Sequence, residues 1–289
     1  MSALLTHLRL LLRISRPAFW MYLFAPFAVG VLIGAPDNFS QQPALVALVA
    51  IFAIYFLFPA NLLAYGLNDI FDYESDKKNP KKTDPGALLP PDKHRRVASW
   101  ITFFNIPFVL ASFFLDAWAI GAFLLFLFLT VFYSAEPIRA KTKPVLDSLF
   151  NALYIVPGIF GYYLVGGQDL RWPIVAAAIL WSMALHAYSA VPDIHADTEA
   201  GLRTIATTFG KKITLIICLA LYLAASILAA QFLGNLSRTL GIIYAILVVI
   251  TIQQKTSQDL LTIYSWFPLF NMITGMALFL MVLLNKLRG

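Results

Sequence analysis

Long apolar stretches that contain almost no charged residues constrain this chain more than any other feature. We count nine such runs, at 17–34, 43–67, 97–115, 117–134, 147–165, 172–191, 213–233, 237–252 and 265–285. Most of them approach the roughly 20 residues that a helix needs to cross the hydrocarbon core of a bilayer. The runs are continuous and do not alternate with period two, as membrane strands would. The sequence therefore predicts an all-α membrane protein with about nine transmembrane helices, or eight if one run is not a span.

Two of these boundaries depend on weaker signals. The stretch 97–134 is almost continuously apolar and too long for one span, so we divide it at Asp116. The run 237–252 is short, and a helix there could be tilted or partly interfacial. Composition supports the membrane interpretation, because 60% of the residues are hydrophobic and only 12% are charged. Soluble domains contain about 25% charged residues.

Lysine and arginine are distributed unevenly among the segments that connect the runs. Most of the 21 lie in the N-terminal segment and in every second connection, above all in 68–96. Short loops rich in Lys and Arg stay in the cytoplasm, so we expect the N-terminus and these loops to be cytoplasmic. We expect residues 1–16, with the amphipathic segment 4–14, to form an interfacial helix before the first span. The whole chain, 1–289, is expected to be a single polytopic domain of the cell membrane.

The net charge of +6 does not require a nucleic-acid partner. The preference of basic loops for the cytoplasm already accounts for it. Attraction to anionic lipid headgroups of the bilayer, or to an anionic substrate, is the second interpretation.

Acidic residues gather in two clusters at the ends of two predicted spans. The first cluster runs Asn68-Asp69-Ile-Phe-Asp72-Tyr-Glu74-Ser-Asp76, and the second runs Asp193-Ile-His195-Ala-Asp197-Thr-Glu199. Within the first, Asn68, Asp72 and Asp76 are four residues apart. Asp193 and Asp197 repeat that spacing in the second. On a helix, residues spaced in this way lie along one face.

Carboxylates stacked along one face repel one another and favour a bound cation. Two unit charges about 6 Å apart repel by roughly 3 kcal/mol at an effective dielectric constant of about 20. Oxygen ligands suit Mg²⁺, with Mn²⁺ as an alternative, and Mg²⁺ commonly shares its coordination with substrate phosphates. A solvated loop edge would explain one such residue but not two matched clusters. The residues expected to hold the metal, and through it a diphosphate, are Asn68, Asp72, Asp76, Asp193 and Asp197.

The two clusters resemble the aspartate-rich motifs of the UbiA-type intramembrane prenyltransferases. The segment from Asn68 to Asp76 resembles the first motif, NDxxDxxxD. The segment from Asp193 to Asp197, with the Gly-x-Arg-Thr stretch 201–204 after it, resembles the second. The resemblance covers nearly the whole chain. It implies a ring of nine transmembrane helices around a central cavity, with both motifs at its cytoplasmic mouth.

The same resemblance implies an activity and roles for individual residues. The activity is Mg²⁺-dependent transfer of a prenyl group from a prenyl diphosphate donor to a hydrophobic small-molecule acceptor. The implied catalytic residues are Asp72, Asp193, Arg139 and Arg16, and the implied substrate-binding residues are Lys93, Tyr133 and Arg203. Lys93 belongs to a loop expected to cap the site. This cap departs from the family pattern, since many members carry Arg-Pro-Leu there and this chain reads Gly-Ala-Leu-Leu-Pro at 86–90.

Three further segments resemble one branch of the family, the lycopene elongases, which transfer dimethylallyl groups to lycopene on the way to C50 carotenoids. These segments are 15–20, 79–82 and 144–149. Asp147 could then accept a proton from the acceptor-derived cation, or it could cap a helix. Alternative acceptors within the family are of the quinone, tocopherol or chlorophyll type. A secondary transporter is the alternative of another class, because carboxylates in membrane proteins often mark ion pathways.

Overall fold

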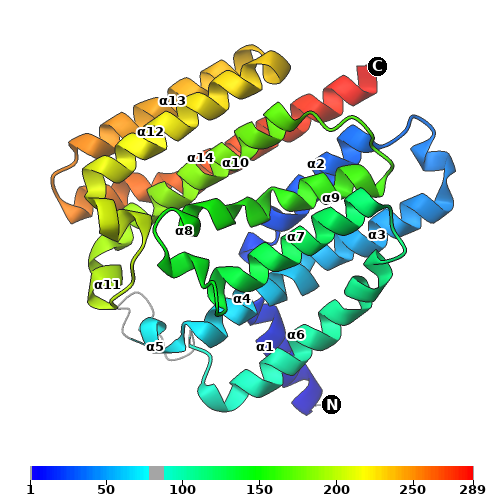
Figure 1. Ribbon diagram of the computed structural model, residues 1–289, viewed down its shortest axis with the longest axis horizontal. Coiled ribbons are helices and arrows are strands. Elements are labelled where there is room, and N and C mark those ends of the chain that lie inside the picture. The colour runs from blue at the N-terminus through cyan, green and yellow to red at the C-terminus, as the bar shows by residue number, and fades with distance from the viewer. Residues whose placement is uncertain (1, 78–87, 289) are drawn as a thin grey trace. The chain divides into compact units, whose positions relative to one another are not determined.

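The computed structural model describes residues 2–77 and 88–288, and every regular element in them is an α-helix or a short 3-10 helix (Figure 1). Strands are absent from these residues, which confirms the all-α prediction. The chain divides into two compact units. Unit 1 comprises Met1–Arg139 and Val156–Leu170, and unit 2 comprises Ala140–Ile155 and Arg171–Gly289.

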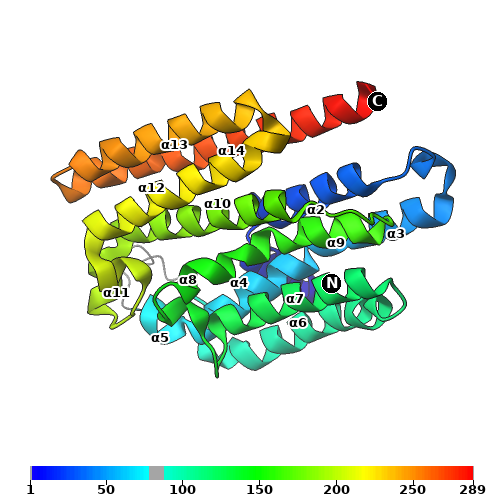
Figure 2. The same ribbon diagram turned by 45° about the horizontal axis from the view of Figure 1, so that its top comes forward.

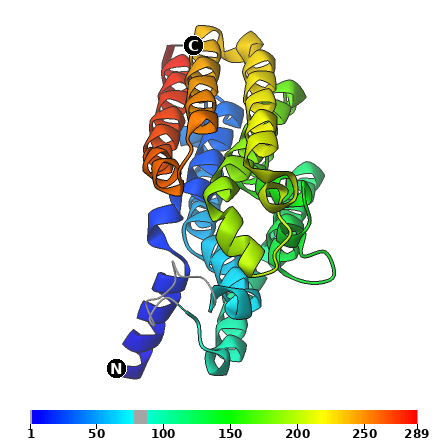
Figure 3. The same ribbon diagram turned by 90° about the vertical axis from the view of Figure 1, so that its left-hand side faces the viewer.

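Unit 1 contains the helices of the first half of the chain and one later helix, α9. Its elements are α1 (Ser2–Ile14), η1 (Pro17–Phe19), α2 (Met21–Gly34), η2 (Phe39–Gln41), α3 (Pro43–Leu57), α4 (Pro59–Phe71), α5 (Tyr73–Asp76), α6 (Pro91–Ser112), α7 (Ala117–Ser134) and α9 (Val156–Leu164). Helix α1, dark blue beside the N label in Figure 3, packs on α4 and α6 through Leu11 and Ile14.

Unit 2 contains the remaining helices. Its elements are η4 (Ala140–Thr142), α8 (Leu146–Leu149), η5 (Phe150–Tyr154), α10 (Trp172–Ala190), η6 (Val191–Asp193), α11 (Ile194–Glu199), α12 (Ile205–Leu233), α13 (Asn235–Gln253) and α14 (Ser257–Arg288). Helices α12 and α13 run side by side along most of their length (Figure 2), and α12 also packs against α10. Tyr188, Tyr222 and Tyr244 are buried in the core of this unit.

Helices α2 and α9 approach each other closely because both carry glycine at the contact. A Cβ atom at Gly30 would lie 1.9 Å from the carbonyl oxygen of Gly158. A Cβ atom at Gly161 would lie 2.5 Å from the carbonyl oxygen of Phe27. Small residues permit such contacts between helices in a membrane, where van der Waals packing replaces the hydrophobic effect as the driving force.

Six helices are long and apolar enough to cross a membrane, or seven if the bent pair His7–Phe19 and Met21–Gly34 counts as one span. The six are Pro43–Phe71, Ala117–Ser134, Trp172–Glu199, Ile205–Leu233, Asn235–Gln253 and Asp259–Leu287. They include the run 237–252, which lies within the full-length helix α13. Seven of the nine predicted runs therefore lie within these helices, and the runs 97–115 and 147–165 do not.

The two exceptions have different physical causes. Helix α6 covers 97–112, but it begins six residues earlier with a charged turn and contains Pro107. The run 147–165 is interrupted, because α8 and η5 occupy its first part and the nine-residue α9 begins beside Pro157. In that first part, the Asn151 side chain donates to the Ser182 carbonyl oxygen at 2.8 Å, which ties η5 to α10.

The division at Asp116 is confirmed, and the structure gives its cause. Asp116 is the N-cap of α7, and its Oδ1 accepts from the Trp118 backbone N–H at 2.9 Å. An N-cap carboxylate satisfies an amide that has no partner within the helix and stabilises the helix start by about 1 kcal/mol. One aspartate therefore ends an apolar stretch that hydropathy alone would read as continuous.

Candidate active site

The first aspartate motif spans the junction of α4 and α5 in unit 1. The Asp72 N–H donates to the Asn68 carbonyl oxygen at 2.9 Å, and the Asp76 N–H donates to the Asp72 carbonyl oxygen at 2.7 Å. These bonds join residues four apart and carry the helical path through the junction. Asn68, Asp72 and Asp76 therefore follow one another along one side of the chain, as their spacing predicts. Asp72 is only 6% exposed.

Arg16 lies beside this motif and pairs with Asp69. Its Nη2 lies 2.6 Å from the Asp69 Oδ1, and its guanidinium sits over the Tyr65 ring, 4.8 Å from the ring centroid. The Arg16 backbone has φ 52°, in the left-handed region that non-glycine residues rarely adopt. A charge-assisted hydrogen bond of this length holds the guanidinium firmly at the first motif.

Asp69 is a residue that the sequence interpretation did not assign to the site. The motif contains it, but the four-residue spacing selects only Asn68, Asp72 and Asp76. Asp69 is about 100° around the helix from Asn68 and three residues before Asp72, so it borders the face that carries those two residues. In the structure, the Asp69 carboxylate accepts a hydrogen bond from Arg16.

Arg139 reaches the same motif from the segment that follows α7. Its Nη2 lies 4.0 Å from the Asp72 Oδ1 and donates to the Phe71 carbonyl oxygen at 3.5 Å. Its Nη1 lies 3.8 Å from the Glu136 Oε1. These separations are long for hydrogen bonds, so the attraction to the two carboxylates is mainly Coulombic. The Arg139 guanidinium therefore lies near the Asp72 carboxylate at ion-pair distance rather than at hydrogen-bond distance.

The end of α7 completes this part of unit 1. The Asn68 amide nitrogen donates to the Ser134 hydroxyl at 3.4 Å, and Ser134 is almost fully buried. Tyr133, the expected substrate-binding residue, directly precedes Ser134 and is half-buried. The structure thus brings two arginines, one amide and the buried Asp72 to the end of α4, with α7 beside them.

The second aspartate motif belongs to unit 2. Asp193 ends the 3-10 turn η6 and is the N-cap residue of α11, which contains Asp197 one turn later. Both are half-buried, and their spacing again places them on one face. His195 between them has a side chain 88% exposed and lies 3.5 Å from the Glu199 Oε1. It therefore contacts the next acidic residue along the helix surface.

Lys141 is a second residue that sequence spacing did not select. It lies in η4 of unit 2, half-buried and close enough to Asp197 for their charges to interact. Burial lowers the pKa of the Lys141 ammonium to about 8, and attraction to the Asp197 carboxylate partly offsets that effect. A lysine with this pKa is charged at neutral pH and lies beside the second motif.

Asp147 is fully buried and holds two helix starts together. Its Oδ2 accepts from the Ile205 N–H at 2.6 Å, at the start of α12, and its Oδ1 accepts from the Ser148 N–H at 2.7 Å. Thr204 and Thr207 complete the α12 start with a capping box. Of the two roles open from sequence, helix capping is the one that the geometry fits, although the capped helix is α12 rather than a fifth span.

Two other expected site residues lie apart from these contacts. Arg203 is exposed in the turn after Gly201 and forms no ion pair with the residues that the structure describes. Lys93 lies in the first turn of α6 and lines a pocket that α6 forms with α1. Residues 78–87, which hold most of the expected cap and the segment 79–82, lie outside the described residues.

The described ranges contain no group of three His, Cys, Asp or Glu side chains arranged to hold a metal ion. The donor chemistry nevertheless fits a hard divalent cation. In unit 1 an amide and two carboxylates share one side of a helical path, and in unit 2 two carboxylates do so.

Comparison with known proteins identifies the family. The model of the UbiA prenyltransferase family matches residues 23–273. The chain belongs to the UbiA prenyltransferase family. It is therefore a prenyltransferase, and its apolar helices are those of a multi-pass membrane protein.

Individual relatives of this UbiA chain are carotenoid enzymes. It is 38% identical to a lycopene elongase/hydratase of Haloferax volcanii, with 96% of this chain and 89% of the relative covered. It is 36% identical to the lycopene elongase/hydratase of Haloarcula japonica, with 98% and 94% covered. A solved UbiA homolog from Archaeoglobus fulgidus, bound to DMAPP and Mg²⁺, has the same fold with a TM-score of 0.68 and 21% identity, covering 93% of this chain and 98% of that one.

Proposed function

We propose that this enzyme transfers a dimethylallyl group from dimethylallyl diphosphate to lycopene, as the first step toward a C50 carotenoid. The observation that carries the acceptor is the similarity to lycopene elongase/hydratases over nearly the whole chain. The donor is supported by the first aspartate motif, where Arg139 lies 4.0 Å from Asp72 and Arg16 pairs with Asp69. Two cations at a motif that contains a buried carboxylate suit a metal-bound diphosphate.

A divalent ion, Mg²⁺ or alternatively Mn²⁺, is part of the proposal. The proposed ligands within unit 1 are Asn68, Asp72 and Asp76, and those within unit 2 are Asp193 and Asp197. When bound, such an ion neutralises charge on the diphosphate oxygens. The structures of homologs with Mg²⁺ and a prenyl diphosphate support this assignment.

The reaction follows from the charges that develop. The C–O bond between the allylic carbon and the diphosphate breaks, and the diphosphate leaves with the electron pair. Arg16 and Arg139 stabilise the negative charge that grows on the leaving group, which lowers the barrier only if the contact is stronger in the transition state. A double bond of lycopene forms the new C–C bond, and the resulting cation then loses a proton or gains water.

Lys141 and Tyr133 are proposed to assist at this step, and Lys93 and Arg203 are weaker candidates. Lys141 is charged at neutral pH and interacts with Asp197, so it can contribute a further cation beside the second motif. Tyr133 is half-buried next to Ser134, the partner of Asn68. Arg203 is exposed, and its role would require it to turn toward substrate.

The direct test is an acceptor panel with purified protein in lipid, dimethylallyl diphosphate and Mg²⁺. Lycopene, 4-hydroxybenzoate, 1,4-dihydroxy-2-naphthoate and homogentisate are compared, and geranyl diphosphate is run in parallel. We expect a prenylated product, detected by mass, with lycopene only, and its loss in EDTA. A product with an aromatic acceptor would keep the enzyme class and reject the acceptor. A product that persists in EDTA would reject the metal.

We also propose that the N-terminus and both aspartate motifs face the cytoplasm, on the basis of the uneven distribution of Lys and Arg. Labelling tests this cleanly, because the only cysteine in the chain, Cys218, is buried. An impermeant thiol reagent added to intact cells should label Asn38→Cys and Gln168→Cys but not Lys255→Cys. The reverse pattern would show the opposite orientation, and labelling of only one of the first two would show that an odd number of the four runs between them cross the membrane, so that either 97–115 or 147–165 does not span.

A further inference from the structure

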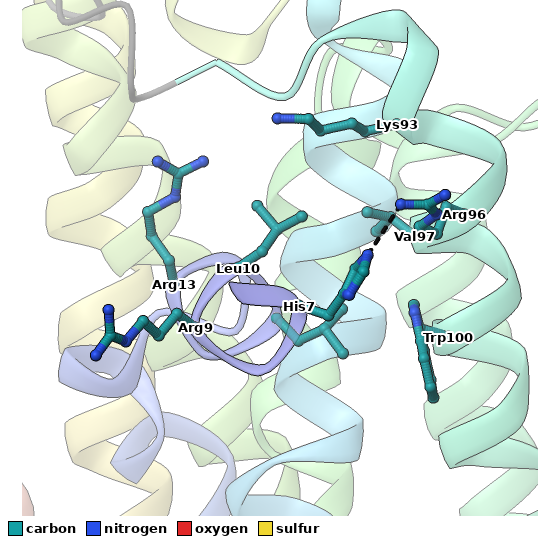
Figure 4. A pocket seen from close by; sticks show the side chains of 9 residues that line it. His7, Arg9, Leu10, Arg13, Lys93, Arg96, Val97 and Trp100 are labelled. Carbon is teal, nitrogen blue, oxygen red and sulfur yellow. Dashed lines mark hydrogen bonds between the residues drawn. The ribbon is translucent and has the colours of Figure 1, made fainter. Parts of the chain in front are cut away.

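A basic pocket lies between α1 and the start of α6 in unit 1. Its volume is about 420 Å³, and Figure 4 shows basic side chains from both helices around its rim. Its lining residues are His7, Arg9, Leu10, Leu11, Arg13, Lys93, Arg96, Val97 and Trp100. Apart from Lys93, a weaker substrate-binding candidate, none of the residues proposed to act in the transfer is among them. The other lining residues are thus ones that the transfer reaction does not explain.

Four of the lining residues are cations, and none is acidic. Arg9, Arg13, Lys93 and Arg96 are all exposed, and none of them forms an ion pair with a residue in the described parts of the chain. Arg96 instead donates from Nη1 to the His7 Nε2 at 2.9 Å. Like charges gathered around one cavity repel one another, and an anion placed among them removes that repulsion. The pocket therefore favours an anionic ligand.

The floor of the pocket is apolar. Leu11 is 2% exposed and Val97 is 1% exposed, and both belong to a core cluster of unit 1. Leu10 and Trp100 pack against the same cluster and are half-buried. A ligand that fits both the rim and the floor has an anionic group joined to an apolar part.

The sequence of α6 indicates the depth of the pocket in a bilayer. The helix starts with charged residues at 92–96, and Trp100 follows one turn later. Beyond Trp100 its exposed side chains are mainly apolar, among them Phe103, Ile106 and Leu110. Tryptophan is enriched where the headgroup region meets the hydrocarbon core. We therefore expect the pocket to lie at the level of lipid headgroups.

Helix α1 presents the matching pattern. Leu5, Leu8 and Leu12 are exposed apolar residues, while Arg9 and Arg13 line the pocket. A helix with exposed leucines and arginines is suited to lie in the interface, with its apolar side toward the acyl chains. Such a helix would expose these leucines to water if the protein were not in a membrane.

We propose that this pocket binds the phosphate headgroup of an anionic phospholipid, with the start of an acyl chain along Leu10 and Trp100. Arginine guanidinium groups suit phosphate oxygens, because they donate two parallel hydrogen bonds. Arg16 follows α1 by two residues, so a lipid that fixes α1 against α6 also helps to fix the turn that carries Arg16. A free diphosphate substrate has the same phosphate chemistry, so the experiment must separate the two sources.

The experiment is native mass spectrometry of purified protein titrated with phosphatidylglycerol, and separately with phosphatidylcholine. The test variant is Arg9→Gln/Arg13→Gln. The control is Arg95→Gln/Lys255→Gln, which removes the same charge from exposed sites that do not line the pocket. We expect wild type and control to retain phosphatidylglycerol about tenfold better than phosphatidylcholine, and the test variant to lose that preference.

Two results would overturn the proposal. One is equal retention of phosphatidylglycerol by the test variant and the control, which would show that net charge alone attracts the lipid. The other is stoichiometric displacement of phosphatidylglycerol by dimethylallyl diphosphate, which would assign the pocket to the substrate. If the double variant is less stable than wild type in thermal unfolding, Arg13→Gln alone replaces it, since that side chain is exposed and forms no ion pair with a described residue.

Discussion

The Arg16 guanidinium and the Asp69 carboxylate form an ion pair of 2.6 Å that joins the turn after α1 to the first aspartate motif. Arg16 is one-third exposed and Asp69 is nearly buried. The pair therefore fixes a cation at the first motif. Asp69, its acidic partner, is the residue of that motif that the four-residue spacing of Asn68, Asp72 and Asp76 does not include.

Asp69→Asn is expected to reduce kcat with little change in the fold. The amide keeps the shape of the side chain but loses the charge that holds Arg16, and the partly exposed pair contributes roughly 1 to 2 kcal/mol. We expect a drop in kcat of about tenfold or more. Steady-state kinetics measures it, and Asp169→Asn, an exposed residue of the same unit, is the control. Unchanged kinetics would show that Arg16 needs no partner.

Asp72→Asn is expected to abolish most of the activity and to raise the Mg²⁺ concentration needed for the rest. The buried carboxylate is proposed to bind the metal and lies 4.0 Å from Arg139, so its loss affects both. We expect a decrease in kcat/KM of at least about 100-fold, or roughly 2.7 kcal/mol. A Mg²⁺ titration of product formation checks this. Glu74→Gln, exposed in the next turn, is the matched control and should behave as wild type.

Lys141→Arg is expected to move the alkaline limb of the pH–activity profile. Burial lowers the pKa of Lys141 to about 8, so wild type should lose this cation, and activity with it, as the pH rises past about 8. Arginine stays charged throughout that range. A profile of kcat/KM from pH 6.5 to 10 would show the limb at higher pH in the variant. An identical limb in both proteins would exclude Lys141 as its source.

The same group makes a prediction about stability. Between about 8 and the ordinary 10.5, the unfolded chain binds more protons than the folded one, because the pKa of Lys141 is lowered only in the folded state. Its contribution to the free energy of unfolding therefore rises with pH across this window. Lys141→Met should remove that rise and raise the thermal midpoint below pH 8. A midpoint lowered at pH 7 would show that the charged lysine stabilises the fold.

Asp147→Asn is expected to destabilise the protein without changing its product. One amide N–H, at Ser148 or Ile205, would face the new NH₂ group, and a buried unsatisfied donor costs about 1 to 3 kcal/mol. Thermal unfolding should show a fall of several degrees. Asp116→Asn is the control, because asparagine caps an exposed helix start as well as aspartate does. A change from hydrated to unsaturated product, or the reverse, would instead identify Asp147 as a proton acceptor.

Gly30→Ala and Gly121→Ala form a pair with opposite expected effects. A Cβ at Gly30 would overlap the Gly158 carbonyl oxygen, so α2 and α9 would have to separate, whereas a Cβ at Gly121 meets nothing within 4 Å. We expect Gly30→Ala to lower the thermal midpoint, and Gly121→Ala to keep or raise it by its helix propensity, about 1 kcal/mol. Similar midpoints for both variants would show that the α2–α9 contact can relax.

Much of the helical framework, and the shared face of Asn68, Asp72 and Asp76, were predictable from sequence, because they depend on local patterns. Hydropathy and one capping aspartate define α7, and i to i−4 spacing defines the face that carries Asn68, Asp72 and Asp76. The identity of the family was also readable from the two motifs. These signals act within a few residues of each other along the chain.

The parts that sequence did not predict depend on contacts between distant residues. The run 147–165 reads as one span, but Asp147 bonds to the start of α12 and Asn151 bonds to α10. A separate helix, α9, then begins at Val156. Asp69 and Lys141 gain their roles only from neighbours in space, Arg16 and Asp197. The spacing of residues within one segment does not reveal such contacts between segments.

The interrupted path of the chain through unit 1 sets an order for biosynthesis. Residues up to Arg139 belong to that unit, the chain then leaves it for sixteen residues, and α9 returns to it. Until the ribosome has released α9, the glycine surface of α2 has no permanent neighbour and stays in contact with lipid or with the insertion machinery. A nascent chain halted near residue 155 therefore leaves the glycine surface of α2 uncovered, where cellular quality-control proteins could recognise it.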